Sequence, residues 1–180
     1  MAIQQHAMRL FAERGYQATT VEQIAAAAEV SPSTFFRYFP TKEAVALYDA
    51  LDPVLVDAFR TQPADRSPVQ ALRGAIWQVF GELPPEELAM QQERDALIRS
   101  VPELRAKMLD EFAKSLQLLA ELVAERVGRQ PDDPAVRTVA GAVIGVGISA
   151  WYTAGDHASP GDYLAVMDAS LAQLEAGLPL

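Results

Sequence analysis

The chain has 180 residues, half of them hydrophobic, no cysteine and a net charge of −9. This hydrophobic content excludes an intrinsically disordered chain, and the absence of cysteine excludes disulfides and thiolate chemistry. Residues 1–43 carry four basic and four acidic side chains, so the whole negative excess lies in residues 44–180. The amphipathic N-terminus lacks the continuous apolar segment of a signal peptide, and we expect a cytoplasmic protein.

The first predicted helix covers residues 3–14, where apolar residues recur at helical spacing, and Gly15 is placed to end it. Thr20 is the expected start of a second helix, 20–28. Thr20 and Gln23 have the spacing of a capping box, in which the two side chains each pair with the backbone amide of the other residue. Two short helices joined by a glycine turn are therefore expected here.

Two further helix starts follow closely. Ser31 is an expected N-cap, and Pro32 occupies the first helical position, where its missing N–H has no intrahelical partner to lose. This third helix, 32–38, is short. Thr41 is the expected cap of a longer fourth helix, 42–60.

The rest of the chain is divided by proline-bearing breaks, with no strand-like alternation of useful length. The predicted helices between these breaks are 68–83, 85–99, 102–128, 133–154 and 160–176. We therefore predict an all-α protein of about nine helices, with an N-terminal helical domain at 1–46 and a helical bundle at 47–180. The most apolar stretch, 136–152, is rich in Gly and Ala and is expected to be a buried packing helix rather than a membrane span.

The second and third predicted helices have the pattern of a helix-turn-helix, which places one helix in the DNA major groove. Ser33 and Thr34 would project hydroxyls from the first turn of the reading helix. Phe36 and Tyr38 would add contacts to thymine methyl groups or phosphates. The residues expected in the core beneath them are Leu10, Phe11, Ile24, Phe35 and Phe39.

Six short runs share their residues and spacing with one family of regulators. These runs are 10–16, 19–21, 24–25, 30–31, 34–39 and 42–43. With its glycine turn, double threonine and aromatic-rich reading helix, the set resembles the TetR family. The resemblance implies an all-helical homodimer that binds double-stranded operator DNA, usually represses transcription and is released by a small-molecule effector. Family members commonly carry a basic arm before the first helix, whereas this chain begins almost at that helix, so either an arm is missing or affinity comes from elsewhere.

Carried over by position, the resemblance implies DNA contacts at Thr20, Pro32, Ser33, Thr34, Phe36, Tyr38 and Lys42. The residues at 32–34 would face bases and Phe36 the base–phosphate boundary, while Thr20, Tyr38 and Lys42 would meet phosphates. Simpler roles remain open: Tyr38 as a buried ring with a solvated hydroxyl, Lys42 as a solvated cation and Thr20 as a cap alone.

Beyond residue 50 the chain resembles the subgroup of mycofactocin-system regulators at 52–53, 62–65 and 97–104, which implies an acyl or acyl-CoA ligand. Side chains that could line a cavity were identified on three predicted helices, with an arginine as partner for an anionic group. They are Trp77, Phe80, Met90, Arg94, Leu97, Met108 and Phe112. The alternative is an ordinary core in which the arginines pair with Glu93, Asp95 or Glu103.

The helix at 133–154 contains glycines four residues apart, which weaken a helix unless another helix packs closely against them. In the TetR family the last two helices usually form the dimer interface. The interface candidates are Gly141, Gly145, Ser149, Trp151, Leu164, Met167, Leu171 and Leu174. Close packing within one subunit is the alternative.

The sequence argues against an enzyme, because the two histidines, His6 and His157, have no metal-ligand spacing and no nucleophile or phosphate-binding motif is present. We expect no cofactor, metal or membrane. The prediction is a TetR-like regulator, most simply a repressor, released by a largely apolar ligand. The alternative is a helical DNA-binding or protein-interaction module that senses nothing.

Overall fold

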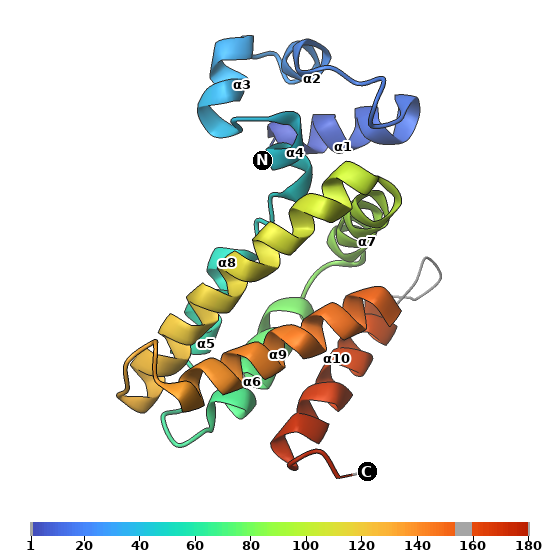
Figure 1. Ribbon diagram of the computed structural model, residues 1–180. Helices are drawn as coiled ribbons and strands as arrows, with labels where there is room; N and C mark the ends of the chain where they lie inside the picture. Colours follow the sequence, from blue (N-terminus) through green and yellow to red (C-terminus); the bar gives the residue numbers. More distant parts are fainter. Residues whose placement is uncertain (1, 154–159, 180) are drawn as a thin grey trace. The chain divides into compact units, whose positions relative to one another are not determined.

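The computed structural model describes residues 2–153 and 160–179, which form ten helices and no strand (Figure 1). The helices are α1 (Ala2–Arg14), α2 (Val21–Ala27), α3 (Pro32–Tyr38), α4 (Lys42–Leu47), α5 (Asp52–Arg60), α6 (Pro68–Phe80), α7 (Pro85–Ser100), α8 (Pro102–Val127), α9 (Pro134–Thr153) and α10 (Pro160–Glu175). The all-α prediction is confirmed. Residue 154, the predicted end of the ninth expected helix, lies outside the described residues.

The count of nine helices is wrong because the helix expected at 42–60 is two helices. Tyr48 leaves helical geometry at the end of α4, with φ −58° and ψ 126°, and α5 begins at Asp52 with a proline in its first turn. In one continuous helix, Pro53 would lack the N–H for the carbonyl of Asp49, and its ring would clash with that carbonyl. The proline therefore fits at the start of a helix and not in the middle of one.

Contacts divide the chain into two compact units. Unit 1 combines Met1–Asp49 with Glu93–Leu109, and unit 2 combines Ala50–Gln92 with Asp110–Leu180. Both α7 and α8 therefore contribute residues to each unit.

Residues 93–109 belong to unit 1 although they follow its N-terminal part by more than 40 positions. Ile98 and Leu104 in this segment are buried. A single domain boundary near residue 46 was predicted, because helical periodicity identifies the apolar face of a helix but not the distant segment that covers this face.

The core of unit 1 is built from the short helices. In it, α1 packs on α2 and α4, and α2 packs on α3. The core residues expected from the sequence are all buried: Leu10, Phe11, Ile24, Phe35 and Phe39. Gly15 ends α1 with φ +83°, a left-handed conformation that costs glycine little, so the predicted glycine turn is confirmed.

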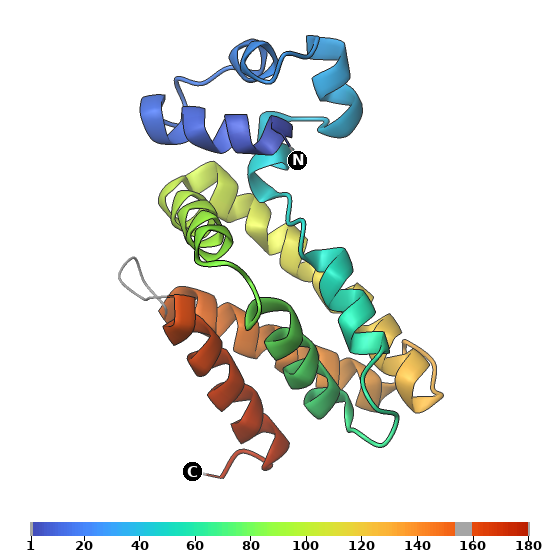
Figure 2. The same ribbon diagram turned by 180° about the vertical axis from the view of Figure 1, so that it is seen from behind.

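In unit 2, α6 packs against both α5 and α10, and α9 packs on α10 (Figures 1 and 2). An ion-pair network joins α6 to α10. Arg73 forms two hydrogen bonds with Asp168, at 2.8 and 3.1 Å, and one with Glu175 at 2.8 Å. The Arg73 hydrogen bonds hold the pKa of Asp168 below its usual value, and hydrogen bonds from Gln70 and Arg73 do the same for Glu175.

Among the described residues, α9 is the one helix long and apolar enough to cross a membrane by length and composition. Core helices of soluble proteins have the same property, so this is weak evidence for a membrane span. Val136, Ala140, Val143 and Ala150 on α9 are buried within unit 2, but only 28% of the apolar stretch is buried, so the expected burial is found on one face of the helix.

Candidate functional site

The turn between α2 and α3 is a compact helix-ending motif. The N–H of Glu29 donates to the carbonyl of Ala26 at 3.1 Å, and the N–H of Val30 donates to that of Ala25 at 2.9 Å. These two bonds form a Schellman motif, which needs a left-handed residue at its end. Glu29 occupies that position with φ 55°, where glycine is the usual residue. The turn thus sets the direction of α3 at the cost of some backbone strain.

Three hydroxyls meet at the first turn of α3. The Ser31 Oγ accepts a hydrogen bond from the Thr34 N–H at 3.1 Å, which confirms the predicted N-cap. The same oxygen lies 2.8 Å from the Ser33 Oγ and 3.0 Å from the Thr34 Oγ1. Pro32 and Ser33 are exposed and Thr34 is half-buried. The side chains predicted to face bases therefore lie together at the N-terminal end of α3.

The aromatic residues of α3 separate onto two faces. Phe35 and Phe39 are buried, whereas Phe36 and Tyr38 are 49% and 54% exposed. Tyr38 is therefore not a buried ring, and that alternative from the sequence is wrong. The Arg37 guanidinium carbon lies 5.2 Å from the centre of the Tyr38 ring, so a cation and two large apolar surfaces lie close together on this short helix.

Lys42 is held by the loop between α1 and α2. Its Nζ donates to the carbonyl of Tyr16 at 2.8 Å and to that of Thr19 at 3.0 Å, and it lies 4.2 Å from the centre of the Tyr16 ring. The freely solvated alternative is wrong for this residue. Because an ammonium has three N–H donors, one remains for an external acceptor such as a phosphate.

Thr20 caps α2 as predicted. Its Oγ1 accepts from the N–H of Gln23 at 3.3 Å, and its own N–H donates to the Gln23 Oε1 at 3.1 Å. The Thr20 side chain is exposed. A capping hydroxyl keeps its proton, which here also serves the Glu22 carboxylate and, second to the Glu22 backbone N–H, helps to lower the pKa of that group. A phosphate contact would therefore replace the bond to Glu22 and leave the cap in place.

Two positioning residues received no role in the sequence analysis. Thr19 is 1% exposed, and its hydroxyl lies 2.9 Å from the Gly15 carbonyl and 3.2 Å from that of Leu10. Tyr16 is buried; burial and the nearby Glu43 carboxylate raise the pKa of its phenol. The double threonine at 19–20 was the sequence signal for a role of Thr19. Because only one of the two threonines can cap α2, the other needs a different role.

The predicted ligand residues are divided between the two units. Trp77, Phe80, Met90 and Phe112 belong to unit 2, and Arg94, Leu97 and Met108 to unit 1. Trp77 and Met90 are exposed. The rings of Phe112 and Trp151 meet edge to face with their centres 6.0 Å apart, which joins a ligand candidate to an interface candidate inside unit 2.

Arg94 makes strong contacts within its own unit. Its guanidinium donates to the Tyr48 carbonyl at 2.9 Å and to the Asp49 carboxylate at 2.6 Å, and lies 3.6 Å from Asp95. The Tyr48 carbonyl also accepts from the Gln4 side chain at 2.6 Å. Burial raises the pKa of Asp95 even though Arg94 acts in the opposite direction. The alternative left open by the sequence was that the arginines pair with carboxylates instead of a ligand. Arg94 does pair with carboxylates, with Asp49 at 2.6 Å and the predicted Asp95 at 3.6 Å.

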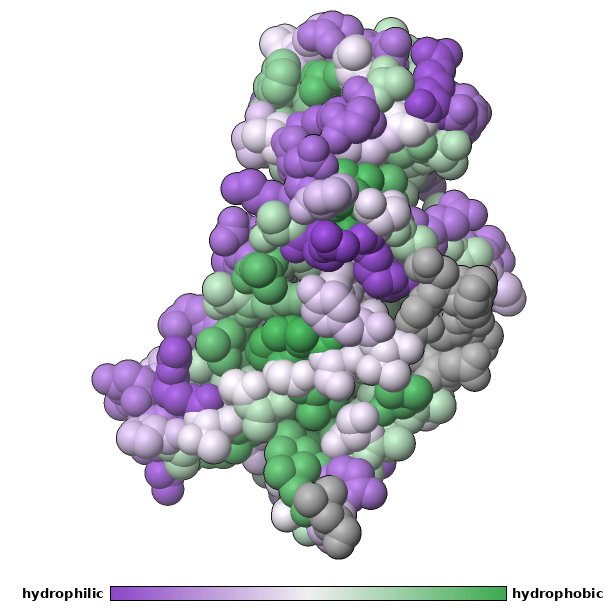
Figure 3. Space-filling view, turned by 45° about the vertical axis from the view of Figure 1, so that its right-hand side comes forward, coloured by the Kyte–Doolittle hydropathy of each residue, from purple (hydrophilic) through white to green (hydrophobic). Residues whose placement is uncertain are grey.

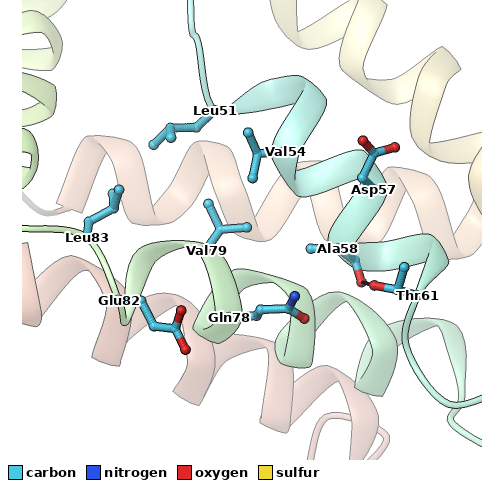
Figure 4. Close-up of a pocket in the computed structure, with 9 residues that line it drawn as sticks. All are labelled: Leu51, Val54, Asp57, Ala58, Thr61, Gln78, Val79, Glu82 and Leu83. Carbon is cyan, nitrogen blue, oxygen red and sulfur yellow. Dashed lines mark hydrogen bonds between the residues drawn. The ribbon is translucent and has the colours of Figure 1, made fainter.

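A groove of about 450 Å³ lies between α5 and α6 in unit 2 (Figure 4). The residues that line it are Leu51, Val54, Asp57, Ala58, Thr61, Gln78, Val79, Glu82 and Leu83. None of the predicted ligand residues is among them. Sequence periodicity could not reveal this groove, because the space depends on how two helices pack and not on either helix alone.

The interface candidates also separate into two groups. Gly141, Gly145 and Ser149 are exposed on α9, and a Cβ added at either glycine would meet no atom within 4 Å. The others are buried or partly buried in unit 2: Trp151, Leu164, Met167, Leu171 and Leu174. Figure 3 shows white and green residues, with few purple ones, along α9. Close packing within the subunit therefore does not explain the two glycines.

Comparison with known proteins decides the family. Residues 3–48 match the bacterial regulatory proteins of the tetR family, and residues 66–179 match the MftR C-terminal domain. The chain belongs to the TetR family of transcriptional regulators. This confirms both resemblances found in the sequence, including that of the C-terminal region to the mycofactocin-system regulators.

Curated relatives of this TetR-family chain include TcmR of Streptomyces glaucescens, an HTH-type transcriptional regulator, at 40% identity over 134 residues. That match covers 71% of this chain and 59% of TcmR. MftR of Mycobacterium tuberculosis, a regulator assigned to mycofactocin biosynthesis, is 31% identical over 150 residues, covering 81% of this chain and 74% of MftR.

Solved structures agree with the TetR-family fold. FadR of Thermus thermophilus, a TetR-family repressor in complex with lauroyl-CoA, has a TM-score of 0.60 at 25% identity and covers 99% of this chain and 94% of its own. FadR of Bacillus halodurans, at 23% identity, gives the same TM-score. The families and relatives are regulators of transcription and not enzymes, as the sequence predicted.

Proposed function

We propose that this TetR-family regulator acts as a homodimeric repressor that binds operator DNA through α3 and is released by a small, largely apolar ligand. The observation that carries the DNA-binding surface is the exposure of Phe36 and Tyr38 beside the three hydroxyls at the start of α3. Two aromatic rings, each about half exposed, leave apolar surface in water on a seven-residue helix, and an external partner explains that exposure best.

In this proposal the start of α3 reads bases. Pro32, Ser33 and Thr34 face base edges. The Ser33 hydroxyl exchanges its contact with Ser31 for one with a base, and the helix keeps its cap because Ser31 caps it through the Thr34 N–H. Phe36 lies at the base–phosphate boundary.

The phosphate contacts of the proposal come from three residues around α3. Tyr38 donates its hydroxyl, Thr20 donates the proton that its cap leaves unused, and Lys42 donates its third N–H. Lys42 thereby links the DNA backbone to the loop that holds Tyr16 and Thr19. Contacts of this kind position the protein on the duplex and carry no sequence information themselves.

The proposed dimer uses the exposed face of α9 together with α10. Gly141 and Gly145 reduce the helix propensity of α9, and a Cβ added at either would meet no neighbouring atom within 4 Å in the described part of the subunit. A second copy packed closely against this face would compensate, and it would cover part of a helix apolar enough to pass for a membrane span. Two reading helices related by a two-fold axis would then match successive major grooves.

The proposed ligand role rests on the helical bundle of unit 2 and on FadR of Thermus thermophilus, whose structure contains lauroyl-CoA. A ligand that binds the non-DNA-binding conformation more tightly shifts the population away from the operator. The alternative, a module that senses nothing, is distinguished by thermal unfolding, because a ligand of the native state raises its stability. As a repressor of bacterial genes the protein would work in the cytoplasm.

The test is binding to a two-fold-symmetric fragment from beside its own gene, with random DNA as competitor. Wild type should prefer the specific fragment, Thr34→Ala with Tyr38→Ala should lose that preference, and Ser115→Ala, at an exposed site of α8, should retain it. Tyr38→Phe removes the hydroxyl and keeps the ring, so this variant should lose the phosphate contact alone. Equal binding of wild type to both fragments would refute the proposal.

A further inference from the structure

The groove between α5 and α6 has the size of a site for a small molecule. Its volume of about 450 Å³ lies within the range of roughly 300–1,000 Å³ common for ligand pockets. Figure 4 shows Leu51, Val54, Val79 and Leu83 extending into the same space from the two sides. Val54 is 51% exposed, although it belongs to the first turn of a helix that packs on α6. An apolar surface of this kind favours the hydrocarbon part of a ligand.

The charge of the groove has a single sign. Asp57 contributes a carboxylate from α5 and Glu82 contributes another from the residues just after α6, while no lysine, arginine or histidine among the described residues lines the space. Nearby guanidinium groups bind elsewhere: Arg60 pairs with Glu125 at 3.2 Å, and Arg66 donates to Gln62 at 2.6 Å.

The two neutral polar residues of the lining differ: Gln78 accepts from the Gln62 side chain at 3.0 Å and keeps its own N–H donors, whereas Thr61 favours an external donor. The Thr61 hydroxyl donates its proton to the Ala58 carbonyl at 3.0 Å, which leaves its oxygen lone pairs for an external donor. An ammonium supplies N–H donors and a positive charge, whereas a carboxylate or phosphate supplies only acceptors and would be repelled by both carboxylates.

We propose that this groove binds a cationic amphiphile, a protonated amine on an apolar body, and that it does not accept the anionic head of a fatty acid or acyl-CoA. The apolar walls hold the hydrocarbon, and the negative charges of Asp57 and Glu82, which lie at different ends of the groove (Figure 4), attract the cation. That such a ligand releases the operator rests on the function proposed above; the binding itself does not.

The experiment uses three probes that share one hydrocarbon chain: octylammonium, octanol and octanoate, titrated calorimetrically into the full-length protein at low ionic strength. Octylammonium should bind most tightly and octanoate least. Asp57→Asn with Glu82→Gln should weaken octylammonium about fivefold, as expected for two exposed ion pairs, and change octanol less than twofold. Asp65→Asn, an exposed carboxylate outside the groove, is the matched control and should change neither.

Octanoate binding as tightly as octylammonium, or a double variant that retains full octylammonium affinity, would overturn the proposal. Tighter binding of lauroyl-CoA that Val54→Asp abolishes would overturn it as well, because an acyl-CoA would then occupy the groove. Circular dichroism confirms that each variant is folded. Operator binding is measured separately. If octylammonium binds but DNA binding is not specific, the proposed site stands and the repressor function is refuted. If DNA binding is specific but octylammonium does not bind, the proposed site is refuted and the repressor function stands.

Discussion

Arg94 and Asp49 form an ion pair with 2.6 Å between Nη2 and Oδ2, although they are 45 residues apart in the chain. The same guanidinium reaches the Tyr48 carbonyl, which also accepts from Gln4. Residues 48–49 follow directly on α4, so α1 and α7 together hold the end of that helix. The side chains of Arg94 and Asp49 are only 13% and 20% exposed, and the pair is therefore poorly screened by solvent.

Replacing Arg94 by methionine should destabilise the protein by about 2 kcal/mol, because the Asp49 carboxylate and the Tyr48 carbonyl each lose a donor in a partly buried place. Urea denaturation measures the loss. Arg9→Met is the matched control, since its pair with Glu13 has side chains about half exposed and should contribute less than about 0.5 kcal/mol. Equal effects of the two variants would show that burial of the Arg94 pair contributes nothing.

Glu29→Gly should stabilise the protein by about 1 kcal/mol, because φ 55° is strained for every residue with a Cβ and not for glycine. Glu29→Ala is the matched variant that removes the charge and keeps the strain, and it should leave the stability almost unchanged. The comparison of urea midpoints decides between them. A gain in Glu29→Ala as large as in Glu29→Gly would assign the effect to charge.

The salt dependence of operator binding should be shallow. Lys42 is a proposed phosphate contact, and Arg37 lies beside the exposed Tyr38 ring, where we expect its charge to neutralise a phosphate as well, which makes four cations in a dimer. At roughly 0.9 per neutralised phosphate, the slope of log K against log salt should be about −4. Arg37→Ala should reduce this slope by about 2, whereas Lys114→Ala on α8 should not. A wild-type slope near −8 would require further cations on the DNA.

The α6–α10 network should give unit 2 an acid-sensitive component of stability. Asp168 and Glu175 have pKa values below their ordinary 3.8 and 4.5, so their contribution is complete above those values. It is lost as the pH falls through the lower pKa values of the folded state. Arg73→Met should make the urea midpoint depend less on pH between about 5 and 3. An unchanged pH profile would mean that Arg73 does not cause the lowered pKa values.

Substitution at Gly145 should separate folding from dimerisation. Gly145→Ala should stabilise α9 by up to about 1 kcal/mol, because the added Cβ meets no atom of the subunit. Gly145→Glu should leave the fold intact and give monomers in sedimentation velocity, because a charged side chain would occupy the proposed close approach. A Gly145→Glu dimer as stable as wild type would move the interface elsewhere.

The short helices of unit 1 were predictable because their start signals are local. The Thr20–Gln23 capping box and the Ser31 cap each lie within three residues, and the structure contains both. Pro53 was also a local signal, but its position in the first turn of α5 was overlooked.

Contacts between distant segments could not be predicted in the same way. Arg94 is drawn to Asp49 and Tyr48 by the packing of α7, and nothing near Arg94 in the sequence identifies those partners. The groove beside Asp57 and Glu82 has the same origin. Sites of this kind depend on tertiary geometry, whereas the exposed residues of α3 follow from the period of one helix and its buried Phe35 and Phe39.

Unit 1 is discontinuous in the chain, since Glu93–Leu109 completes the part formed by Met1–Asp49. During synthesis the first 49 residues are translated well before Arg94, Ile98 and Leu104. The nascent helix-turn-helix therefore lacks its lateral support until about residue 109 has emerged. For the same reason a chimera that exchanges DNA specificity between relatives has to carry residues 93–109 along with the N-terminal segment.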